Sequence, residues 1–576
     1  MALFYEEYYK EIKDDAGNIL RIETTVGDDF NFAYDVVDRF AKNEPEKLAM
    51  LHRTADGVEN RFSFSDLSRL SNKAANMLTR LGIKKGQPVM LLLKRRYEFW
   101  ISILAIHKIG AVAVPTSHMV SAKDIRERIK TAGISAVICV ANGGIKEKVC
   151  EAINGLAMEG LDTITITVGE SGNVADCYKY NADNAINSAD RREKIYDYWT
   201  EMEKSPEFFA RKKTSVTDHM LYYFTSGTSG SPKAVIQDFS YPLAHIYTAK
   251  NWHGITEGDL HLTVADSGWA KSAWGKLYGQ MFMGAAILVY DYEQFYAADL
   301  LHLLEKEKVN TFCAPPTIYK YLVLEDLEKY NLEHLRCATT AGEPMPIEVA
   351  QKFESMTDIS IREGFGQTET ALLICTPVGG GAKTGTLGKA SPLYEILLVD
   401  EDDKPVAAGE EGEIVLKVPE NGRLIGVFKG YLGDDNLYKE VFRDGLYHTR
   451  DKAILDNDGY YCFMGRNDDV IKSSGYRIGP SEVEDVLMQH PAVFECAVTG
   501  YPSKRRGTVV KASVILKSGY TASEQMANEL KEYVKERVAI YKYPRMISFP
   551  DSLPRTANGK ISRAKIRKLD EKALAY

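Results

Sequence analysis

Apolar residues recur first at helical and then at strand spacing through the first half of the chain. Between residues 66 and 81 they fall three and four positions apart, and Gly82 follows as a stop signal, which predicts an amphipathic helix. Residues 89–93 form a continuous apolar run, as expected of a strand buried on both faces. A second helix is expected over residues 100–109, and a short strand over residues 111–114.

Further strand candidates continue this alternation at residues 136–140, 163–167, 221–224 and 286–290. Strands that alternate with helices favour parallel sheets with crossover helices, so the expected fold class is α/β. We expect a large N-terminal domain of parallel-rich sheets with helices packed against them.

The C-terminal part of the chain has a different pattern. Helices are expected to begin at Ser481 and near Ser523, with strands over residues 495–499 and 509–516 between them. Ser481 and Glu484 have the spacing of a capping box, which supports the first of these helices. The pattern predicts a small α+β domain.

Length and composition agree with two domains. A chain of 576 residues is too long for one hydrophobic core. The polar stretch over residues 465–469 suits a domain junction, so we predict an N-terminal domain of residues 1–467 and a C-terminal domain of residues 468–576. With 45% hydrophobic and 26% charged residues, the composition is typical of a globular protein.

The formal net charge of −8 argues against nucleic acid as an obligate partner, because phosphate binding needs a positive surface. A local basic patch can still hold a nucleotide. No apolar run approaches the roughly 18 residues needed to span a bilayer, and the acidic N-terminus lacks a signal-peptide core. We therefore expect a cytoplasmic protein without a membrane span; an oligomer is not indicated but stays open.

A loop rich in glycine and hydroxyl residues follows the strand expected at residues 221–224. It reads T-S-G-T-S-G-S-P-K over residues 225–233. Glycine lets the backbone approach a phosphate closely, the hydroxyls donate to its oxygens, and Lys233 supplies charge. A generic stretch of this kind is more often a surface turn. It is not a Walker loop, because Ser231 and Pro232 separate the last glycine from Lys233.

The loop resembles, almost position for position, the phosphate loop of the adenylate-forming superfamily, which includes acyl-CoA synthetases, luciferases and peptide-synthetase adenylation domains. Five further stretches resemble motifs of this superfamily and occur in its order, at residues 341–344 (A-G-E-P), 363–369 (E-G-F-G-Q-T-E), 447–451 (Y-H-T-R-D), 465–477 and 553–560 (L-P-R-T-A-N-G-K). Any one match is weak, but ordered matches across the chain identify it as a member. The closest resemblance is to medium-chain acyl-CoA synthetases.

The resemblance implies a two-step reaction. A carboxylic acid attacks the α-phosphate of ATP and expels pyrophosphate, and the acyl group of the adenylate then passes to coenzyme A. ATP, Mg²⁺ and the co-substrate coenzyme A are the implied cofactors, and the partner is a small-molecule carboxylic acid. Because two anions must meet, catalysis depends mostly on positioning and electrostatic stabilisation.

The resemblance also assigns residues to these steps. Lys560 would bridge the attacking carboxylate and the α-phosphate, and Thr368 and Glu369 are the other catalytic candidates, with Glu369 as the Mg²⁺ ligand. Asp451 would accept both ribose hydroxyls. Without the motifs, Lys560 would be interpreted as a solvated surface charge and Glu369 as a helix N-terminal acid. The residues assigned to ATP are Thr225, Ser226, Gly227, Thr228, Ser229, Gly230, Lys233, Gly342, Glu343, Pro344, Glu363, Gly364, Phe365, Gly366, Gln367, Asp451, Arg466 and Arg477.

Asp468 matches the hinge position of the superfamily. After adenylation the small C-terminal domain would rotate, withdraw Lys560 and bring another face to the site. The residues assigned to coenzyme A are Ser474, Gly475, Tyr476, Arg506 and Lys535. For Arg506 and Lys535 the alternative of plain surface charge stays nearly as strong.

Gly366 bears on the choice of acid. Acetyl-CoA synthetases carry two consecutive tryptophans in the motif that corresponds to Phe365 and Gly366, and the second shortens the acyl pocket. Gly366 lacks that plug, so we expect a medium-chain, branched or aromatic acid. Trp269 and Trp274 would wall the acyl pocket, or else pack in a core helix. Lys271 either points into the pocket, where it needs a polar partner, or points out.

One position departs from the superfamily. Arg450 stands where the family usually has glycine, and it would carry strain if the backbone there needs positive φ. Either the turn differs or Arg450 has a contact of its own.

Three other functions share features with this prediction. An adenylation domain that loads a carrier-protein thiol and a luciferase-like oxygenase would share the first half-reaction. A non-catalytic nucleotide-binding protein is the third alternative, and the presence of Lys560, Glu369 and Asp451 together argues against it.

Overall fold

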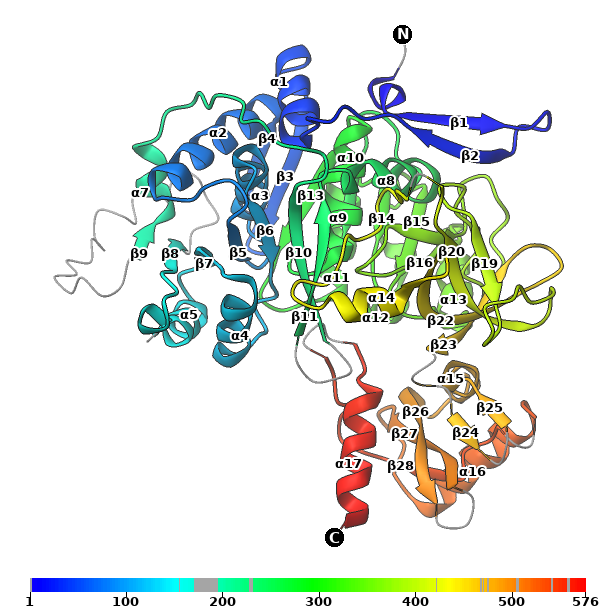
Figure 1. Ribbon diagram of the computed structural model, residues 1–576. Coiled ribbons are helices and arrows are strands. Elements are labelled where there is room, and N and C mark those ends of the chain that lie inside the picture. The colour runs from blue at the N-terminus through cyan, green and yellow to red at the C-terminus, as the bar shows by residue number, and fades with distance from the viewer. Residues whose placement is uncertain are drawn as a thin grey trace.

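The computed structural model describes residues 3–154, 156–169, 195–226, 232–420, 422–466, 469, 471–473, 476–503, 507–539, 542–556 and 560–575. Two large sheets with their helices form the upper part of the molecule in Figure 1, and a smaller C-terminal unit lies below them. No helix in these ranges is both long and apolar enough to cross a membrane.

The first large sheet is the one predicted from the apolar runs of the first half. Within the described residues it has the order β11-β10-β6-β5-β7-β8-β9, and all neighbours are parallel except β10 and β11. Every residue of β6 and β7 is buried, which explains their unbroken apolar sequence. The strands are β5 (Pro88–Leu92), β6 (Val112–Pro115), β7 (Ala136–Val140), β8 (Ile164–Val168), β9 (Ile195–Asp197), β10 (His219–Ser226) and β11 (Pro232–Asp238).

The second large sheet has the order β18-β17-β16-β15-β14-β12-β13-β3-β4 in the part of the chain that is described. Its centre, from β16 to β3, is parallel, and both edges are antiparallel. The strands are β3 (Leu48–Thr54), β4 (Glu59–Ser63), β12 (Leu260–Thr263), β13 (Ala286–Asp291), β14 (Thr311–Cys313), β15 (Cys337–Ala341), β16 (Ile361–Gly366), β17 (Leu372–Cys375) and β18 (Lys389–Ala390).

Helices connect and cover these sheets. The two helices predicted from periodicity are confirmed as α2 (Phe64–Arg80), which Ser63 caps, and α3 (Glu98–Ile109), which is buried along its whole length and ends at Gly110. The others are α1 (Arg39–Asn43), α4 (Ala122–Ala132), α5 (Ile145–Ile153), α7 (Tyr198–Glu203), α8 (Tyr241–Tyr247), α9 (Ala270–Lys276), α10 (Tyr278–Phe282), α11 (Ala297–Lys306), α12 (Pro316–Leu322), α13 (Ile347–Thr357) and α14 (Asp435–Val441).

A third, antiparallel sheet lies between the large sheets and the C-terminal unit (Figure 1). It consists of β19 (Ile396–Val399), β20 (Glu411–Lys417), β21 (Phe442–Arg443), β22 (Leu446–Leu455) and β23 (Tyr461–Arg466), with β22 at its centre. Near the N-terminus, β1 (Tyr9–Lys13) and β2 (Ile19–Thr24) form a separate hairpin.

The C-terminal unit has its own hydrophobic core, which includes Ile478, Leu487, Val510 and Leu530. Its predicted elements are confirmed, and its overall character is α+β. They are β24 (Ile471–Ser473), β25 (Tyr476–Ile478), α15 (Pro480–Met488), β26 (Val493–Ser503), β27 (Gly507–Leu516), α16 (Glu524–Lys535), β28 (Met546–Ser548) and α17 (Arg563–Ala575). The boundary predicted between residues 467 and 468 stays a prediction.

The capping box predicted at Ser481 is wrong. Helix α15 begins one residue earlier, at Pro480, with Gly479 as N-cap and no side-chain cap. Glu484 serves a tertiary role instead, because its carboxylate accepts from the backbone N–H of Val498 at 2.7 Å and from Arg563.

Candidate functional site

The predicted motifs gather at the carboxyl ends of parallel strands. Ala341 ends β15 and Gly366 ends β16, and these adjacent strands bring two motifs to one edge of their sheet. The segment after β12 approaches the segment after β6 so closely that a Cβ atom on Gly268 would lie 2.1 Å from the backbone nitrogen of Ser117. The carboxyl edges of the two large sheets therefore adjoin, at the position where open α/β sheets bind ligands.

Side chains from two motifs meet at Gln367. Its Nε2 atom donates to the backbone oxygen of Thr449 at 2.7 Å and to Oδ2 of Asp451. Its Oε1 atom accepts from the hydroxyl of Tyr447 at 2.7 Å. These bonds join the segment after β16 to strand β22 of the third sheet.

Asp451 is a buried carboxylate at this junction. It is 6% exposed and pairs with Arg466 in the ladder of β22 and β23. Burial raises the pKa of its carboxyl to about 6, while Arg466 and the hydrogen bond from Gln367 lower it. A carboxylate held in this way can accept the two hydroxyls of a ribose.

Glu369 lies beside Tyr431, whose hydroxyl donates to its Oε1 atom at 3.0 Å. Burial raises the pKa of the Glu369 carboxyl, whereas the Tyr431 hydrogen bond and the positive charges of Arg466 and Lys233 lower it. The Lys233 ammonium is 6.0 Å from the centroid of the Tyr431 ring. The lysine of the glycine-rich loop and the acid predicted to bind a cation therefore share one tyrosine as a neighbour.

Lys560 reaches this region from the C-terminal unit. A Cβ atom on Gly342 would lie 3.7 Å from the Lys560 Nζ atom, and Gly342 has a φ of +101° that favours glycine. The Lys560 side chain is exposed to water on one side, yet the surrounding protein lowers the pKa of its ammonium, and the negative charges of Glu343 and Asp451 raise it. A cation, a buried carboxylate and a cradle without side chains are thus assembled from both parts of the molecule.

Comparison with known proteins agrees with this arrangement. The family model described as AMP-binding enzyme matches residues 37–432, and the model of the AMP-binding enzyme C-terminal domain matches residues 482–560. The chain belongs to the AMP-binding enzyme family.

Full-length relatives and a solved structure extend the likeness. The 4-hydroxybutyrate–CoA ligase 1 of Metallosphaera sedula is 36% identical over 547 residues, which are 94% of this chain and 91% of the relative. The mitochondrial acyl-coenzyme A synthetase ACSM5 of Homo sapiens is 35% identical over 547 residues, 93% and 90% of the two chains. The crystal structure of the anthranilate CoA ligase AuaEII in complex with anthranoyl-AMP has a TM-score of 0.82 and 27% identity, covering 96% of this chain and 99% of that one.

The structure decides between the two alternatives left open for Arg450: the turn keeps a positive φ, and Arg450 has contacts of its own. Its φ is +62°, so this AMP-binding enzyme keeps the left-handed turn even without glycine. Its backbone N–H donates to Oε1 of Glu413 at 2.8 Å, and its guanidinium donates to Oε2 of Glu440 at 2.9 Å. Arg450 therefore carries the strain and has contacts of its own.

Lys271 of this AMP-binding enzyme points inward. Its Nζ atom donates to the backbone oxygen of Ala341 at 2.9 Å, next to the glycine beside Lys560. Burial lowers the pKa of Lys271, and the nearby charge of Lys560 lowers it further. Two ammonium groups therefore approach the Ala341–Gly342 segment.

The space beside Gly366 is not empty. A Cβ atom on Gly366 would lie 2.5 Å from Cη2 of Trp274 and 2.5 Å from the backbone oxygen of Ala371. Trp274 is 5% exposed and donates from Nε1 to the hydroxyl of Tyr241 at 3.1 Å. Trp274 of α9 therefore occupies the space beside Gly366, so the lack of a side chain at Gly366 does not by itself leave free depth at this point. Trp269, which precedes α9, is half-buried.

Several of the other residues predicted to bind ATP lie at or near the carboxyl ends of β10, β15 and β16. Thr225 pairs with Lys233 in the ladder of β10 and β11. The carboxylate of Glu363 accepts from the backbone N–H of Met345 at 3.2 Å. The other members with described positions are Glu343 and Pro344 after Gly342, Gly364 against the Trp252 ring, Phe365 against Phe463, and Thr368, whose backbone oxygen accepts from Gln237.

Only two of the coenzyme A candidates, Tyr476 and Lys535, lie among the described residues. Lys535 lies on α16, bonded to Glu532 at 2.8 Å and 5.8 Å from the centroid of the Tyr543 ring. Tyr476 lies in strand β25. Of the ATP candidates, Arg477 lies in the same strand and Ser226 is the last residue of β10. Gly227, Thr228, Ser229, Gly230, Asp468, Ser474, Gly475 and Arg506 lie outside the described residues.

Sequence reasoning missed several members of the site. Tyr431 has no motif around it, and only the fold brings its hydroxyl to Glu369. Gln367 is among the residues assigned to ATP and Tyr447 lies inside a recognised motif, but nothing local indicates that their side chains bond each other. Gln237 of β11 lies outside the site and supports the loop after β16, because its Nε2 atom donates to the backbone oxygen of Thr368 at 3.0 Å. Local sequence gives no signal for this role, since β11 also contains the polar residues Lys233 and Asp238.

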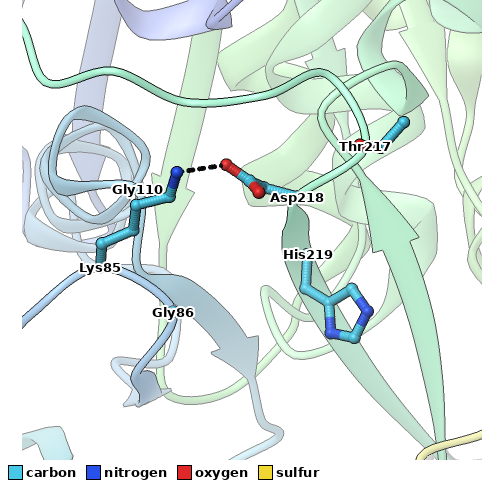
Figure 2. Close-up of a pocket in the computed structure, with 6 residues that line it drawn as sticks. All are labelled: Lys85, Gly86, Gly110, Thr217, Asp218 and His219. Carbon is cyan, nitrogen blue, oxygen red and sulfur yellow. Dashed lines mark ion pairs between the residues drawn. The ribbon is translucent and has the colours of Figure 1, made fainter.

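A separate small pocket lies on the opposite edge of the first sheet. Figure 2 shows its lining of Lys85, Gly86, Gly110, Thr217, Asp218 and His219, with an ion pair of 2.7 Å between Lys85 and Asp218. Gly86 and Gly110 each lie two residues before the first residue of β5 and β6, and His219 begins β10. These are the amino ends of the strands whose carboxyl ends face the motifs, so the pocket is remote from the candidate site.

Proposed function

We propose that this AMP-binding enzyme is an AMP-forming acyl-CoA synthetase. It converts ATP and a carboxylic acid to an acyl-adenylate and pyrophosphate, and then transfers the acyl group to coenzyme A with release of AMP. The observation that carries the proposal is the placement of Lys560 of the C-terminal unit beside Gly342, in a region that also holds Asp451 and Glu369. Family membership and the acyl-CoA synthetase relatives support it.

In the first half-reaction the protein holds two anions together. Asp451 accepts the ribose hydroxyls, and Lys560 neutralises the carboxylate and the α-phosphate as they approach. Lys233 and its loop hold the β- and γ-phosphates, and Thr368 and Glu369 complete the catalytic set. Arg466 adds positive charge near Asp451 and Glu369.

Glu369 suits a divalent cation. Its carboxylate is enclosed, it accepts one hydroxyl hydrogen bond, and burial raises its pKa, so a bound cation would compensate the cost of its charge. Mg²⁺ held there would neutralise negative charge on the phosphates of ATP. The hydrogen bond from the Tyr431 hydroxyl would orient the Glu369 carboxylate toward the phosphates.

The acid is proposed to be medium-chain, branched or aromatic. Trp274 walls the space beside Gly366, Trp269 lies at the start of the same helix, and Lys271 lies between that helix and the Ala341 backbone. The relatives are described as acting on 4-hydroxybutyrate and anthranilate, both larger than acetate. The wall at Trp274, rather than a gap at Gly366, is proposed to set the length of the acid.

The second half-reaction is proposed to follow a rotation of residues 468–576 about Asp468. That movement would withdraw Lys560 and bring Ser474, Gly475 and Tyr476 to the site. Arg477 is assigned to the phosphates of ATP. Arg506 and Lys535 would bind the phosphates of coenzyme A. A cytoplasmic location belongs to the same proposal.

A panel of carboxylic acids tests the function. Purified protein is assayed for acid-dependent ATP–pyrophosphate exchange without coenzyme A, and for AMP release with and without it. Exchange with a medium-chain, branched or aromatic acid, and AMP release that needs coenzyme A, are expected. Acetate as the best acid would refute the substrate class. Exchange without coenzyme A-dependent AMP release would favour an enzyme that loads a carrier protein.

A further inference from the structure

We propose that Gln367 is a positioning residue for nucleotide recognition: its side-chain amide orients Asp451 toward the ribose hydroxyls of ATP. This inference rests on the proposed function, because Asp451 has its ribose role there. It adds a residue that acts through Asp451 and does not itself touch the reacting atoms.

The amide of Gln367 is held at three points. Nε2 donates both to the backbone oxygen of Thr449, at 2.7 Å, and to Oδ2 of Asp451, and Oε1 accepts from the Tyr447 hydroxyl at 2.7 Å. Both hydrogens and the oxygen of the amide therefore have partners, and Tyr447 is itself buried. A side chain bonded at every polar atom has little rotational freedom, so it can fix the carboxylate that it contacts.

The surroundings allow one orientation of the amide. The atoms facing Nε2 are a backbone carbonyl oxygen and a carboxylate oxygen, and both can only accept. With the amide reversed, Oε1 would face two acceptors, and the Tyr447 hydroxyl would lose its acceptor. Gln367 therefore presents a donor to Asp451, as the ionised carboxylate requires.

The backbone of Gln367 is anchored independently of its side chain. Its N–H donates to Oγ1 of Thr370 at 3.0 Å, and the next carbonyl, that of Thr368, accepts from Nε2 of Gln237 at 3.0 Å. Loss of the Gln367 amide would thus leave the loop in place and release mainly the Asp451 carboxylate.

One bond from Gln367 also leaves Asp451 able to bind the ribose. An ionised carboxylate has about four acceptor positions, and Nε2 occupies one of them on Oδ2. The other acceptor positions of the Asp451 carboxylate can still accept two ribose hydroxyls, but only when the carboxylate has the orientation that Gln367 fixes. Selectivity for ATP over an analogue without those hydroxyls should therefore depend on Gln367.

The test is equilibrium binding of ATP and of 2′,3′-dideoxy-ATP by titration calorimetry with Mg²⁺ and without acid. The readout is the ratio of the dissociation constant for 2′,3′-dideoxy-ATP to that for ATP, which should exceed one in the full-length wild type. Gln367→Leu should lower this ratio by roughly tenfold, as expected for a hydrogen bond to a charged group. Gln367→Glu, which places a like charge against Asp451, should lower it at least as much. Tyr447→Phe should lower it less, because Thr449 still holds the amide.

Gln237→Leu is the matched control. This glutamine bonds the same loop but not Asp451, so the ratio should stay at the wild-type value even if the protein melts at a lower temperature. If Gln367→Leu weakens both nucleotides equally, or neither, the inference is overturned, because a purely structural role would not change the ratio. A wild type that prefers ATP but shows no pyrophosphate exchange with any acid would instead count against the proposed function.

Discussion

Lys560 of the C-terminal unit lies beside Gly342 of the N-terminal part, so that a Cβ atom added to Gly342 would lie 3.7 Å from the Lys560 Nζ atom, in ordinary van der Waals contact. A single Cβ atom would fit beside this ammonium, but the φ of +101° at Gly342 is strained for any residue that carries one. The relationship joins a motif at the end of β15 to a motif near the C-terminus, and it supports a catalytic arrangement of the two.

Gly342→Ala is expected to lower the rate of ATP–pyrophosphate exchange by about tenfold or more, because alanine is strained at a φ of +101° and a backbone shift of about 1 Å beside Lys560 would misplace a catalytic group. Transfer of the acyl group from supplied acyl-adenylate to coenzyme A should be unaffected. Gly57→Ala is the control, because Gly57 has a similar φ of +96° and no heavy atom within 4 Å of its added Cβ. Equal losses in the two variants would show that strain at any such glycine, and not the position of Gly342 beside Lys560, is responsible.

Lys560→Ala should abolish acid-dependent pyrophosphate exchange and spare thioester formation from supplied acyl-adenylate. The reason is that the ammonium is needed where two anions meet, and only the first half-reaction has that step. Lys565→Ala, on the exposed start of α17, is the matched control and should retain exchange. Loss of both half-reactions, or of neither, would contradict the role given to Lys560.

The stability of the protein should fall as pH rises toward 8. Burial raises the pKa of Glu363 to about 8 from an ordinary value of 4.5, and the nearby carboxylate of Asp485 also raises it. The folded state thus keeps a proton on Glu363 that the unfolded chain releases. The contribution of this proton to the free energy of unfolding is complete below pH 4.5 and is lost as the pH rises through about 8.

Melting temperatures of wild type and Glu363→Gln between pH 5 and pH 9 measure this effect, because glutamine keeps the acceptor for the Met345 N–H without titrating. The wild-type melting temperature should decline more steeply than that of the variant. Parallel curves would show that Glu363 titrates near its ordinary pKa.

Trp274→Ala is expected to shift acid preference toward longer or bulkier acids. Removal of the ring vacates the space beside Gly366, and preference, measured as the ratio of kcat/KM for a large and a small acid, should rise about tenfold. The variant should also be destabilised by about 3–5 kcal/mol, as for other buried aromatic residues. Trp100→Ala, a buried tryptophan on α3, should lose similar stability with unchanged preference. An unchanged ratio in Trp274→Ala would place the acyl chain elsewhere.

Arg450→Gly should change the free energy of unfolding by less than about 1 kcal/mol, because relief of the left-handed strain is offset by lost ion pairing and greater chain entropy. Arg450→Val should cost roughly 2 kcal/mol or more, since a β-branched residue tolerates positive φ poorly. Urea denaturation of both variants provides the comparison. A large loss in Arg450→Gly would mean that the bond to Glu440 contributes more than exposed ion pairs usually do.

Much of the fold was predictable from local pattern. The helix over residues 66–81 and the strand over residues 136–140 agree with α2 and β7, because the period of apolar residues reflects which face is buried. Ser481 shows the limit of that reasoning. Ser481 and Glu484 have capping-box spacing but form no capping box, and Glu484 instead bonds Val498 and Arg563, which are distant in sequence.

The sequence by itself determined the order of the motifs, the α/β class and the chemical identity of the groups in the site, since residue type and spacing need no third dimension. Only the tertiary structure decided that Trp274 fills the space at Gly366, that Arg450 keeps a left-handed turn, and that Lys560 lies on Gly342. These contacts join residues far apart in the chain. Their occurrence depends on how sheets, helices and the C-terminal unit pack together, and packing is a property of the whole fold rather than of any segment.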